Sequence, residues 1–195
     1  MDTDSLKIGI LHPGKMGSSV GAVLVGEGHD VIWASEGRSE ETTQRAVDGG
    51  LRDVKTLVQV ANEADIIFSI CIQTAAYSNL SDIKSTDFSG IYVDANFIDE
   101  HHVDDFNAAA AGKKFSYVDG CIYGYPIPGP EGFTDERTFY LYGDEAQSIA
   151  DLFDGTLFEG MVLDESAKIF RARRMAEETP DPPDTDQDTD AAESD

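Results

Sequence analysis

The chain has few basic residues, few cysteines and no long apolar segment. Its 195 residues include 14 Lys and Arg against 38 Asp and Glu, a formal net charge of −24. Because phosphate contacts need Lys and Arg, this shortage argues against binding nucleic acid or an anionic membrane surface. The acidic excess with scarce Lys suggests a halophilic protein adapted to a high-salt cytoplasm. A merely acidic protein from an ordinary cytoplasm is the alternative.

The two cysteines, Cys71 and Cys121, are too few for a disulfide scaffold. Cys71 lies in an apolar run, so we expect it to be buried and reduced. The sequence has no signal peptide and no apolar run of about 18 residues, which predicts a soluble, cytoplasmic protein. Its length is sufficient for one main domain with a good core.

Short apolar strands alternate with helix-length amphipathic segments over the first two-thirds of the chain. This pattern predicts an α/β fold with a Rossmann-type doubly wound, mostly parallel sheet and helices on both faces. Strands are expected at 7–12, 29–35, 64–72, 90–97, 114–122, 138–143 and 160–163. Helices are expected at 15–27, 39–49, 99–111 and 145–153. Ser39 is the expected N-cap of the second helix.

The stretch ILHPGKMGSSVG (10–21) joins the first strand to the first helix. It is a variant of the dinucleotide-binding turn G-x-G-x-x-G, with His12 and Pro13 where the first glycine would begin the turn. Gly14 stands where the second glycine lets the backbone approach a pyrophosphate, and Gly17 where the third allows close helix–strand packing. The helix N-terminus favours the bound phosphates. The alternative is a Gly-rich connection that binds no ligand.

The longer stretch HPGKMGSSVGAVLVGEGHDVIWASEGRSEET (12–42) resembles a known family. It is similar to the N-terminal domain of β-hydroxyacid dehydrogenases, the relatives of 3-hydroxyisobutyrate and 6-phosphogluconate dehydrogenase. The resemblance is strongest to a branch in which His-Pro-Gly replaces the usual Gly-Leu-Gly, and it covers roughly residues 6–163. It implies a nicotinamide cofactor and reversible hydride transfer involving a small hydroxy acid.

The end of the second strand, ASEGRS, bears on the choice of cofactor. Ser35, Arg38 and Ser39 can form an anion pocket for the 2′-phosphate of NADP. Glu36 is the contrary signal, because it suits the ribose hydroxyls of NAD; alternatively, Arg38 is an ordinary solvated charge. The sequence favours NADP and leaves NAD possible. The expected cofactor-binding residues are His12, Gly14, Lys15, Met16, Gly17, Ser35, Arg38, Ser39, Cys71, Ile72 and Asn96, the last three by resemblance alone.

Two later stretches bear on the substrate. By resemblance, Asn96 in VDANF approaches the nicotinamide; it could equally cap the turn after the strand. VDGCIYGYPIPG (118–129) resembles the family's substrate-binding segment, but Tyr123 and Tyr125 replace its usual Ser and second Gly. A Pro/Gly-rich surface loop with tyrosines packed on the sheet is the alternative. The expected substrate-binding residues are Asn96, Asp119, Tyr123 and Gly124.

The family's proton-transferring lysine lies on a helix that opens a large all-helical domain. Lys168 stands near that position, but Ala172 replaces the family's asparagine one turn later. A lone lysine beside Arg171, Arg173 and Arg174 is more typical of a solvated or partner-facing charge, so Lys168 is a weak catalytic candidate. The expected organisation is a cofactor-binding domain (1–163), a helix left from the linker to a missing helical domain (164–176) and a disordered acidic tail (177–195).

The leading hypothesis is an NADP-dependent oxidoreductase acting on a small hydroxy acid, working as a homodimer or with a separately encoded helical subunit. The second is a stand-alone NAD(P)-binding module, a sensor or subunit without dehydrogenase activity of its own. A third is a truncated product that folds and binds nothing. No metal site is expected.

Overall fold

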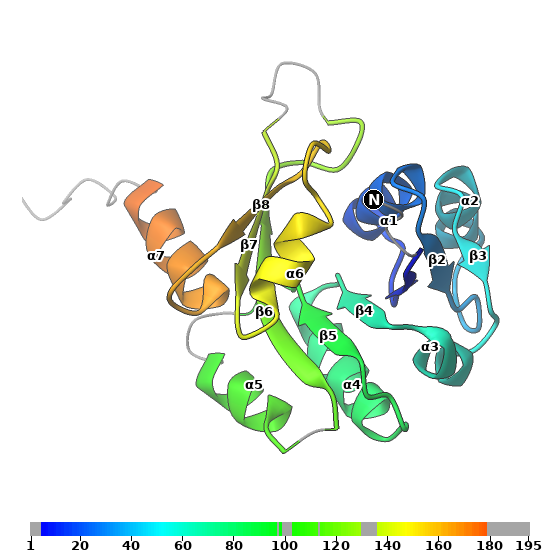
Figure 1. Cartoon of the computed structure of the whole chain (residues 1–195), viewed down its shortest axis with the longest axis horizontal. Helices are drawn as coiled ribbons and strands as arrows, with labels where there is room; N and C mark the ends of the chain where they lie inside the picture. Colours follow the sequence, from blue (N-terminus) through cyan, green and yellow to red (C-terminus); the bar gives the residue numbers. More distant parts are fainter. Residues whose placement is uncertain (1–4, 97, 99–102, 113, 130–135, 179–195) are drawn as a thin grey trace, which may run out of the picture.

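The computed structural model describes residues 5–96, 98, 103–112, 114–129 and 136–178. In this part of the chain, eight strands form one sheet in the order β3-β2-β1-β4-β5-β6-β7-β8 (Figure 1). Neighbouring strands from β1 to β6 are parallel, β7 is antiparallel to β6, and β8 is parallel to β7. The strands are β1 (Lys7–Ile10), β2 (Asp30–Trp33), β3 (Arg52–Asp53), β4 (Ile66–Ser69), β5 (Ile91–Asp94), β6 (Ser116–Tyr123), β7 (Thr138–Tyr142) and β8 (Glu159–Val162).

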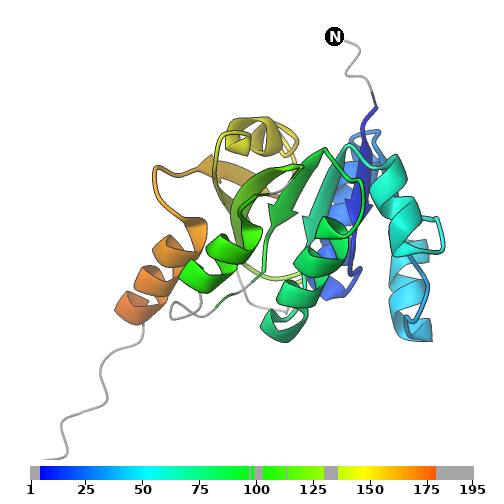
Figure 2. The same ribbon diagram turned by 90° about the horizontal axis from the view of Figure 1, so that it is seen from below.

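Helices cover both faces of the sheet. The helices are α1 (Lys15–Gly26), α2 (Glu40–Asp48), α3 (Leu57–Glu63), α4 (Gln73–Lys84), α5 (Val103–Ala110), α6 (Ala146–Asp151) and α7 (Ala167–Glu178). Helices α1, α2 and α6 lie on one face, and α3, α4, α5 and α7 lie on the other (Figures 1 and 2). The first face buries a cluster that includes Val20, Leu24, Ile149 and Phe153. The second buries a cluster that includes Val60, Leu80, Ile83 and Phe106. The sheet is therefore apolar on both sides, as a parallel sheet must be.

The order of the strands fixes where a ligand can bind. The chain winds outward from β1 to β3 and then returns to β4 on the other side of β1, so the winding reverses between β1 and β4. Ligands of open α/β sheets bind at such a switch point, outside the carboxyl ends of the strands. The turn after β1 and the loop after β4 flank this point.

The structure confirms the predicted Rossmann-type fold and the Ser39 cap, whose side chain accepts a hydrogen bond from the Thr42 amide. The sequence reading missed three elements, β3, α3 and α4. Helix α7 also runs two residues beyond the predicted end at 176. The rest of the predicted tail, 179–195, lies outside the described residues, as do residues 99–102 at the start of the helix expected at 99–111.

Both cysteines are free thiols, and the burial expected of Cys71 is not observed. Cys121 is buried, whereas Cys71 is only half-buried because it lies in the loop after β4 rather than inside the strand. Among the described residues, no helix combines the length and the apolar character that crossing a membrane requires.

Candidate functional site

The turn after β1 leads directly into the first turn of α1. Gly14 is the N-cap residue in an extended conformation, and among the described groups no side chain caps this helix end. The first intrahelical bond runs from the Ser18 amide to the Gly14 carbonyl, 2.8 Å. The amides of Lys15, Met16 and Gly17 have no helical partner and remain available to a ligand, whereas the Gly14 amide donates to the His12 carbonyl, 2.8 Å.

The two glycines of this turn have different structural roles. A Cβ added at Gly17 would overlap the His12 carbonyl oxygen, so the glycine is required for the helix to pack against the turn. A Cβ added at Gly14 meets no described atom within 4 Å. Open space in front of uncapped amides is what a pyrophosphate needs. The residues present therefore fit a dinucleotide.

The expected anion pocket is arranged differently from the prediction. Ser39 uses its hydroxyl to cap α2, and the amide of Ser35 donates to the Asp53 carboxylate, 3.2 Å. The exposed Arg38 turns toward the phosphate turn, where its Nη1 lies 2.7 Å from Nδ1 of His12. The side chain of Arg38 thus contacts His12, while its amide donates to the Ser35 carbonyl, 3.1 Å.

A second cluster lies at the carboxyl end of β5 and beside it in the middle of β6. Asp94 and Asp119 are partners in the parallel register, so their side chains project side by side on one face of the sheet. Lys168 of α7 bridges the two carboxylates: its Nζ lies 3.0 Å from Asp94 Oδ1 and 2.5 Å from Asp119 Oδ1. Ser166 also donates a hydrogen bond to Asp119. The cluster anchors α7 to the sheet.

Burial and charge shift the pKa values of this cluster. Burial opposes the charge on Lys168, but the carboxylates of Asp94 and Asp119 outweigh it and hold the pKa of the amine well above its usual range. Burial raises the pKa of Asp94, and the Lys168 ammonium only partly offsets this shift. Lys168 is therefore an ammonium ion at neutral pH.

Lys168 is not the solvated charge that its local sequence suggests. Its side chain is only 1% exposed, and its Nζ lies 5.5 Å from the centre of the Phe106 ring of α5. The neighbouring arginines also fold back onto the protein: Arg173 pairs with Glu165, and Arg174 donates to the Tyr140 hydroxyl, 3.0 Å. Figure 2 shows α7 beside α5 on the same face of the sheet.

Asn96 joins the ends of two strands. It is 1% exposed, and its Oδ1 accepts a hydrogen bond from the Cys71 amide while its Nδ2 donates to Ser69 and Asp94. The side-chain amide therefore lies inside the protein. It fixes the loop after β4, where Ile72 is 73% exposed.

The remaining expected substrate residues are spread along β6 and its end. Asp119 is buried against Lys168, whereas Tyr123 is exposed, with the Arg174 guanidinium 5.1 Å from its ring centre. Gly124 has φ +111°, and its backbone packs against the Glu136 carbonyl. Tyr123 and Tyr125 are 37% and 39% exposed, so each ring is partly covered and partly open to solvent.

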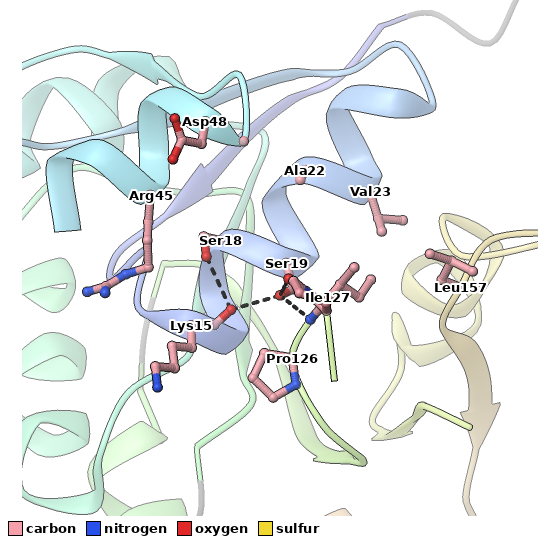
Figure 3. A pocket seen from close by; sticks show the side chains of 12 residues that line it. Lys15, Ser18, Ser19, Ala22, Val23, Arg45, Asp48, Pro126, Ile127 and Leu157 are labelled. Carbon is pink, nitrogen blue, oxygen red and sulfur yellow. Dashed lines mark hydrogen bonds between the residues drawn. The ribbon is translucent and has the colours of Figure 1, made fainter. Parts of the chain in front are cut away.

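A cavity of about 670 Å³ lies beside the phosphate turn (Figure 3). Lys15 and Arg45 stand at one end and Val23 and Leu157 at the other. Ser19 closes one wall, because its hydroxyl accepts a hydrogen bond from the Ile127 amide, 2.8 Å. Of the expected cofactor-binding residues, only Lys15 lines this cavity, so it adjoins the candidate site without containing it.

The sequence-based prediction missed two buried polar residues, Ser69 and Asn79, that help to connect the phosphate turn with the Lys168 cluster. Oδ1 of Asn79 accepts a hydrogen bond from Nε2 of His12, 2.9 Å, and Nδ2 of Asn79 donates to Ser69. Ser69 in turn bonds Asn96, which bonds Asp94. The available signal was a polar residue in an otherwise apolar setting: Ser69 within IIFSICI and Asn79 on the buried face of α4.

Comparisons with known proteins agree with this architecture. Among solved structures, a conserved protein of unknown function, described as similar to 3-hydroxyacid dehydrogenases, has a TM-score of 0.72 at 22% identity, covering 88% of this chain and 63% of its own. The 3-hydroxyisobutyrate dehydrogenase of Mycobacterium tuberculosis, solved with L-serine, has a TM-score of 0.71 at 18% identity, covering 89% and 59%. A reductive aminase from Aspergillus terreus, solved with NADPH and ethyl levulinate, has a TM-score of 0.69 at 14% identity, covering 89% and 61%.

At these identities the likeness shows the fold alone, and the chain spans about three-fifths of the length of these proteins. No curated protein matches the sequence. The family model described as the NAD binding domain of 6-phosphogluconate dehydrogenase matches residues 7–138, which include the phosphate turn and most of the sheet. The chain therefore belongs to the family of 6-phosphogluconate dehydrogenase NAD-binding domains.

Proposed function

We propose that this chain binds NADP(H) and is the cofactor-binding part of an oxidoreductase that acts on a small hydroxy acid. The observation that carries the proposal is the uncapped start of α1 with open space in front of Gly14. This site lies at the switch point of the sheet, and the chain belongs to a family of NAD-binding domains.

The backbone of the phosphate turn holds the pyrophosphate in this proposal. The residues concerned are Gly14, Lys15, Met16 and Gly17. Arg38 binds the 2′-phosphate, because a guanidinium offers paired donors to phosphate oxygens and this one is exposed beside the turn. Ser35 and Ser39 complete the adenosine end, and the exposed Ile72 covers it from the loop after β4. The preference for NADP over NAD rests on Arg38.

When bound, the nicotinamide supplies the hydride acceptor or donor. Lys168 is the proposed proton donor, because its ammonium form can protonate a carbonyl oxygen when a hydroxy acid is the product. The amine meets a substrate only when the contact between α7 and the sheet opens, since it is buried against two carboxylates. The proposed substrate contacts are Tyr123, Gly124 and, once this contact opens, the buried Asn96 and Asp119.

The proposed catalytic unit includes a partner for α7. Residues 1–163 form the cofactor-binding unit, and α7 is the segment that contacts a second copy or a separately encoded helical polypeptide. Ile169, 44% exposed on this helix, supports the assignment.

A cofactor-binding module without turnover is the second candidate. The specific observation in its favour is the burial of Lys168, whose side chain is 1% exposed and paired on two sides. In that case α7 is a fixed part of the domain, and NADP(H) is sensed rather than consumed.

Calorimetric titration with NADP⁺ and NAD⁺ tests the proposal directly. We expect saturable binding that favours NADP⁺, and Arg38→Ala should weaken NADP⁺ binding by roughly 10-fold or more, the value of a charged hydrogen bond, without weakening NAD⁺ binding. Lys114→Ala is the control, since it removes one positive charge at an exposed pair with Asp87, outside the site. Absence of binding to either dinucleotide would overturn the proposal.

Turnover assays then separate the two candidates. The absorbance of NADPH is followed with L-serine, 3-hydroxyisobutyrate and 6-phosphogluconate as trial hydroxy acids. Reduction of NADP⁺ that is abolished in Lys168→Met, while NADP⁺ affinity is retained, supports the oxidoreductase. Binding without turnover, in the presence of co-purifying partners, supports the module.

A further inference from the structure

The side chain that replaces the first glycine of the phosphate turn is held by two other elements. Nε2 of His12 lies 2.9 Å from Oδ1 of Asn79 on α4, and Nδ1 lies 2.7 Å from Nη1 of Arg38 in the loop after β2. The ring is half-buried between these contacts. His12 thus stands between the proposed phosphate-binding arginine and the interior of the site.

These contacts fix the protonation state of the ring. Arg38 has only donors, so Nδ1 of His12 must be an unprotonated acceptor. The proton of the neutral ring therefore lies on Nε2 and is donated to Oδ1 of Asn79. The orientation of Asn79 agrees, because its Nδ2 donates to Ser69 Oγ at 3.3 Å and to Cys71 Sγ at 3.2 Å. The observed arrangement exists only while His12 is neutral.

The surroundings favour this neutral state in the absence of an anion. Burial lowers the pKa of His12, the hydrogen bond to Asn79 partly opposes this, and the charge of Arg38 lowers the pKa further. Burial also raises the pKa of Cys71 to about 11, so its thiol carries no charge at neutral pH. The other charged groups around the turn are Lys15 on α1, Glu36 beside Arg38, and the ion pair of Arg45 with Glu41 on α2, where Arg45 also donates to the Pro13 carbonyl.

We propose that His12 holds Arg38 in the free protein and releases it to the 2′-phosphate of NADP, taking up a proton as it does so. The inference rests on the proposed function and adds a positioning residue to it. A phosphate close to its doubly charged form is a stronger acceptor for a guanidinium than a neutral imidazole is. Arg38 therefore exchanges His12 for the 2′-phosphate. The freed Nδ1 then gains a proton, because the added anion stabilises an imidazolium ion.

Two consequences follow for binding. The affinity for NADP⁺ gains a contribution from His12 that grows as the pH falls toward the ordinary range of histidine, and NAD⁺, which lacks the 2′-phosphate, gains less. His12→Gln keeps an amide oxygen that can accept from Arg38 but removes the titrating group. This variant should bind NADP⁺ within a few-fold of the wild type at a pH about two units above the ordinary histidine value, where the wild-type ring is neutral.

The experiment is calorimetry of NADP⁺ and NAD⁺ in two buffers with different ionisation enthalpies, at a pH near the reference value for histidine, about 6.5. The difference between the buffers gives the protons taken up per cofactor bound. The 2′-phosphate itself titrates near pH 6, so the measured quantity is the wild-type proton count minus that of His12→Gln. We expect this difference to be a few tenths of a proton for NADP⁺, because the titrations of His12 in the free and the bound protein overlap. The difference should be smaller for NAD⁺. His29→Gln is the control, because His29 bonds the Leu6 amide at the opposite edge of the sheet.

Ring-nitrogen NMR gives an independent reading. The His12 signal, assigned by its loss in His12→Gln, should report a neutral Nε2–H ring in the free protein and an imidazolium ion after NADP⁺ is added. Equal proton counts and an unchanged ring signal in a protein that binds NADP⁺ would overturn the inference and leave the proposed function intact. A wild-type protein that binds no NADP⁺ would overturn both.

Discussion

Two cations stand at the carboxyl edge of the sheet, and their surroundings differ in almost every respect. Arg38 is exposed, projects from a loop and bonds a neutral ring that can give it up. Lys168 is buried, belongs to a helix and is paired with two carboxylates from adjacent strands. The first arrangement is suited to meeting an anion from solution, whereas the second is suited to holding elements together.

The comparison explains why resemblance alone is a poor guide to the chemistry of this chain. Both residues are expected from the sequence to act in binding or catalysis, Lys168 by resemblance to the family and Arg38 from its place after the second strand. What separates them is accessibility, which depends on residues far away in the sequence. For Lys168 these are Asp94 and Asp119, and for Arg38 the partner is His12. Each of the following experiments alters one side of this contrast.

The largest expected effect is on stability, from removing the buried cation. Lys168→Met leaves Asp94 and Asp119 side by side without a counter-charge, and breaking a buried ion pair in this way costs about 3–5 kcal/mol of unfolding free energy. Urea denaturation followed by circular dichroism measures the change. Ile169→Ala on the exposed side of the same helix should cost well under that, and adding Asp119→Asn to Lys168→Met should restore part of the loss. A loss below about 1 kcal/mol, typical of a surface ion pair, would mean that Lys168 is not an anchor.

The two glycines of the phosphate turn should separate stability from binding. Gly17→Ala places a methyl group where it overlaps the His12 carbonyl oxygen. It should lower the unfolding free energy by about 1–3 kcal/mol, as overpacking does. Gly14→Ala has room and an ordinary φ of −68°, so its unfolding free energy should stay within about 0.5 kcal/mol of the wild type. Its NADP⁺ affinity should nevertheless fall, because the methyl group occupies the space proposed for the pyrophosphate. Unchanged affinity in Gly14→Ala would place the cofactor elsewhere.

The sequence predicted the fold and the phosphate turn better than the buried cluster of Lys168, Asp94 and Asp119. The alternation of apolar strands and helices and the spacing of Gly14 and Gly17 are local patterns, and the structure keeps them. Helix α3 was missed although Thr56 and Gln59 form a capping box at its start, so a readable signal was present. Helix α4 had no such signal, because its N-cap is Ile72 and its composition is mixed.

The burial of Lys168 was not readable from its neighbours. The local sequence AKIFRARR is basic and predicts exposure. The deciding interactions come from carboxylates 74 and 49 positions earlier, brought together only because β5 and β6 pair in one register. In the same way, the bond between His12 and Arg38 spans 26 positions and depends on how the loops after β1 and β2 meet.

A smaller effect is expected from alkaline pH. The pKa of Lys168 is raised in the folded protein, so the folded chain keeps a proton that the unfolded chain loses above about pH 10.5. The stability from the charged lysine is therefore complete below that value and is lost as the pH rises through the folded pKa. Stability curves at increasing pH should show a steeper alkaline decline for the wild type than for Lys168→Met. Equal declines would mean that Lys168 ionises alike in both states.

The smallest expected effect is on folding stability at acid pH, and it comes from His12. The pKa of His12 is lowered in the folded protein, so below about pH 6.5 the unfolded chain binds more protons than the folded one. Folding stability should therefore fall as the pH drops from that value, and His12→Gln should reduce this slope. His29→Gln is the control for the effect of NADP⁺ on this slope, since that ring bonds the Leu6 amide, away from the Arg38–His12 contact. Adding NADP⁺ sharpens the test, because an imidazolium formed in the complex would reverse the sign of the His12 contribution and make the bound protein relatively more stable at the lower pH. If the slope is the same in all three proteins with and without NADP⁺, the Arg38–His12 contact has no energetic link to the titration of the ring.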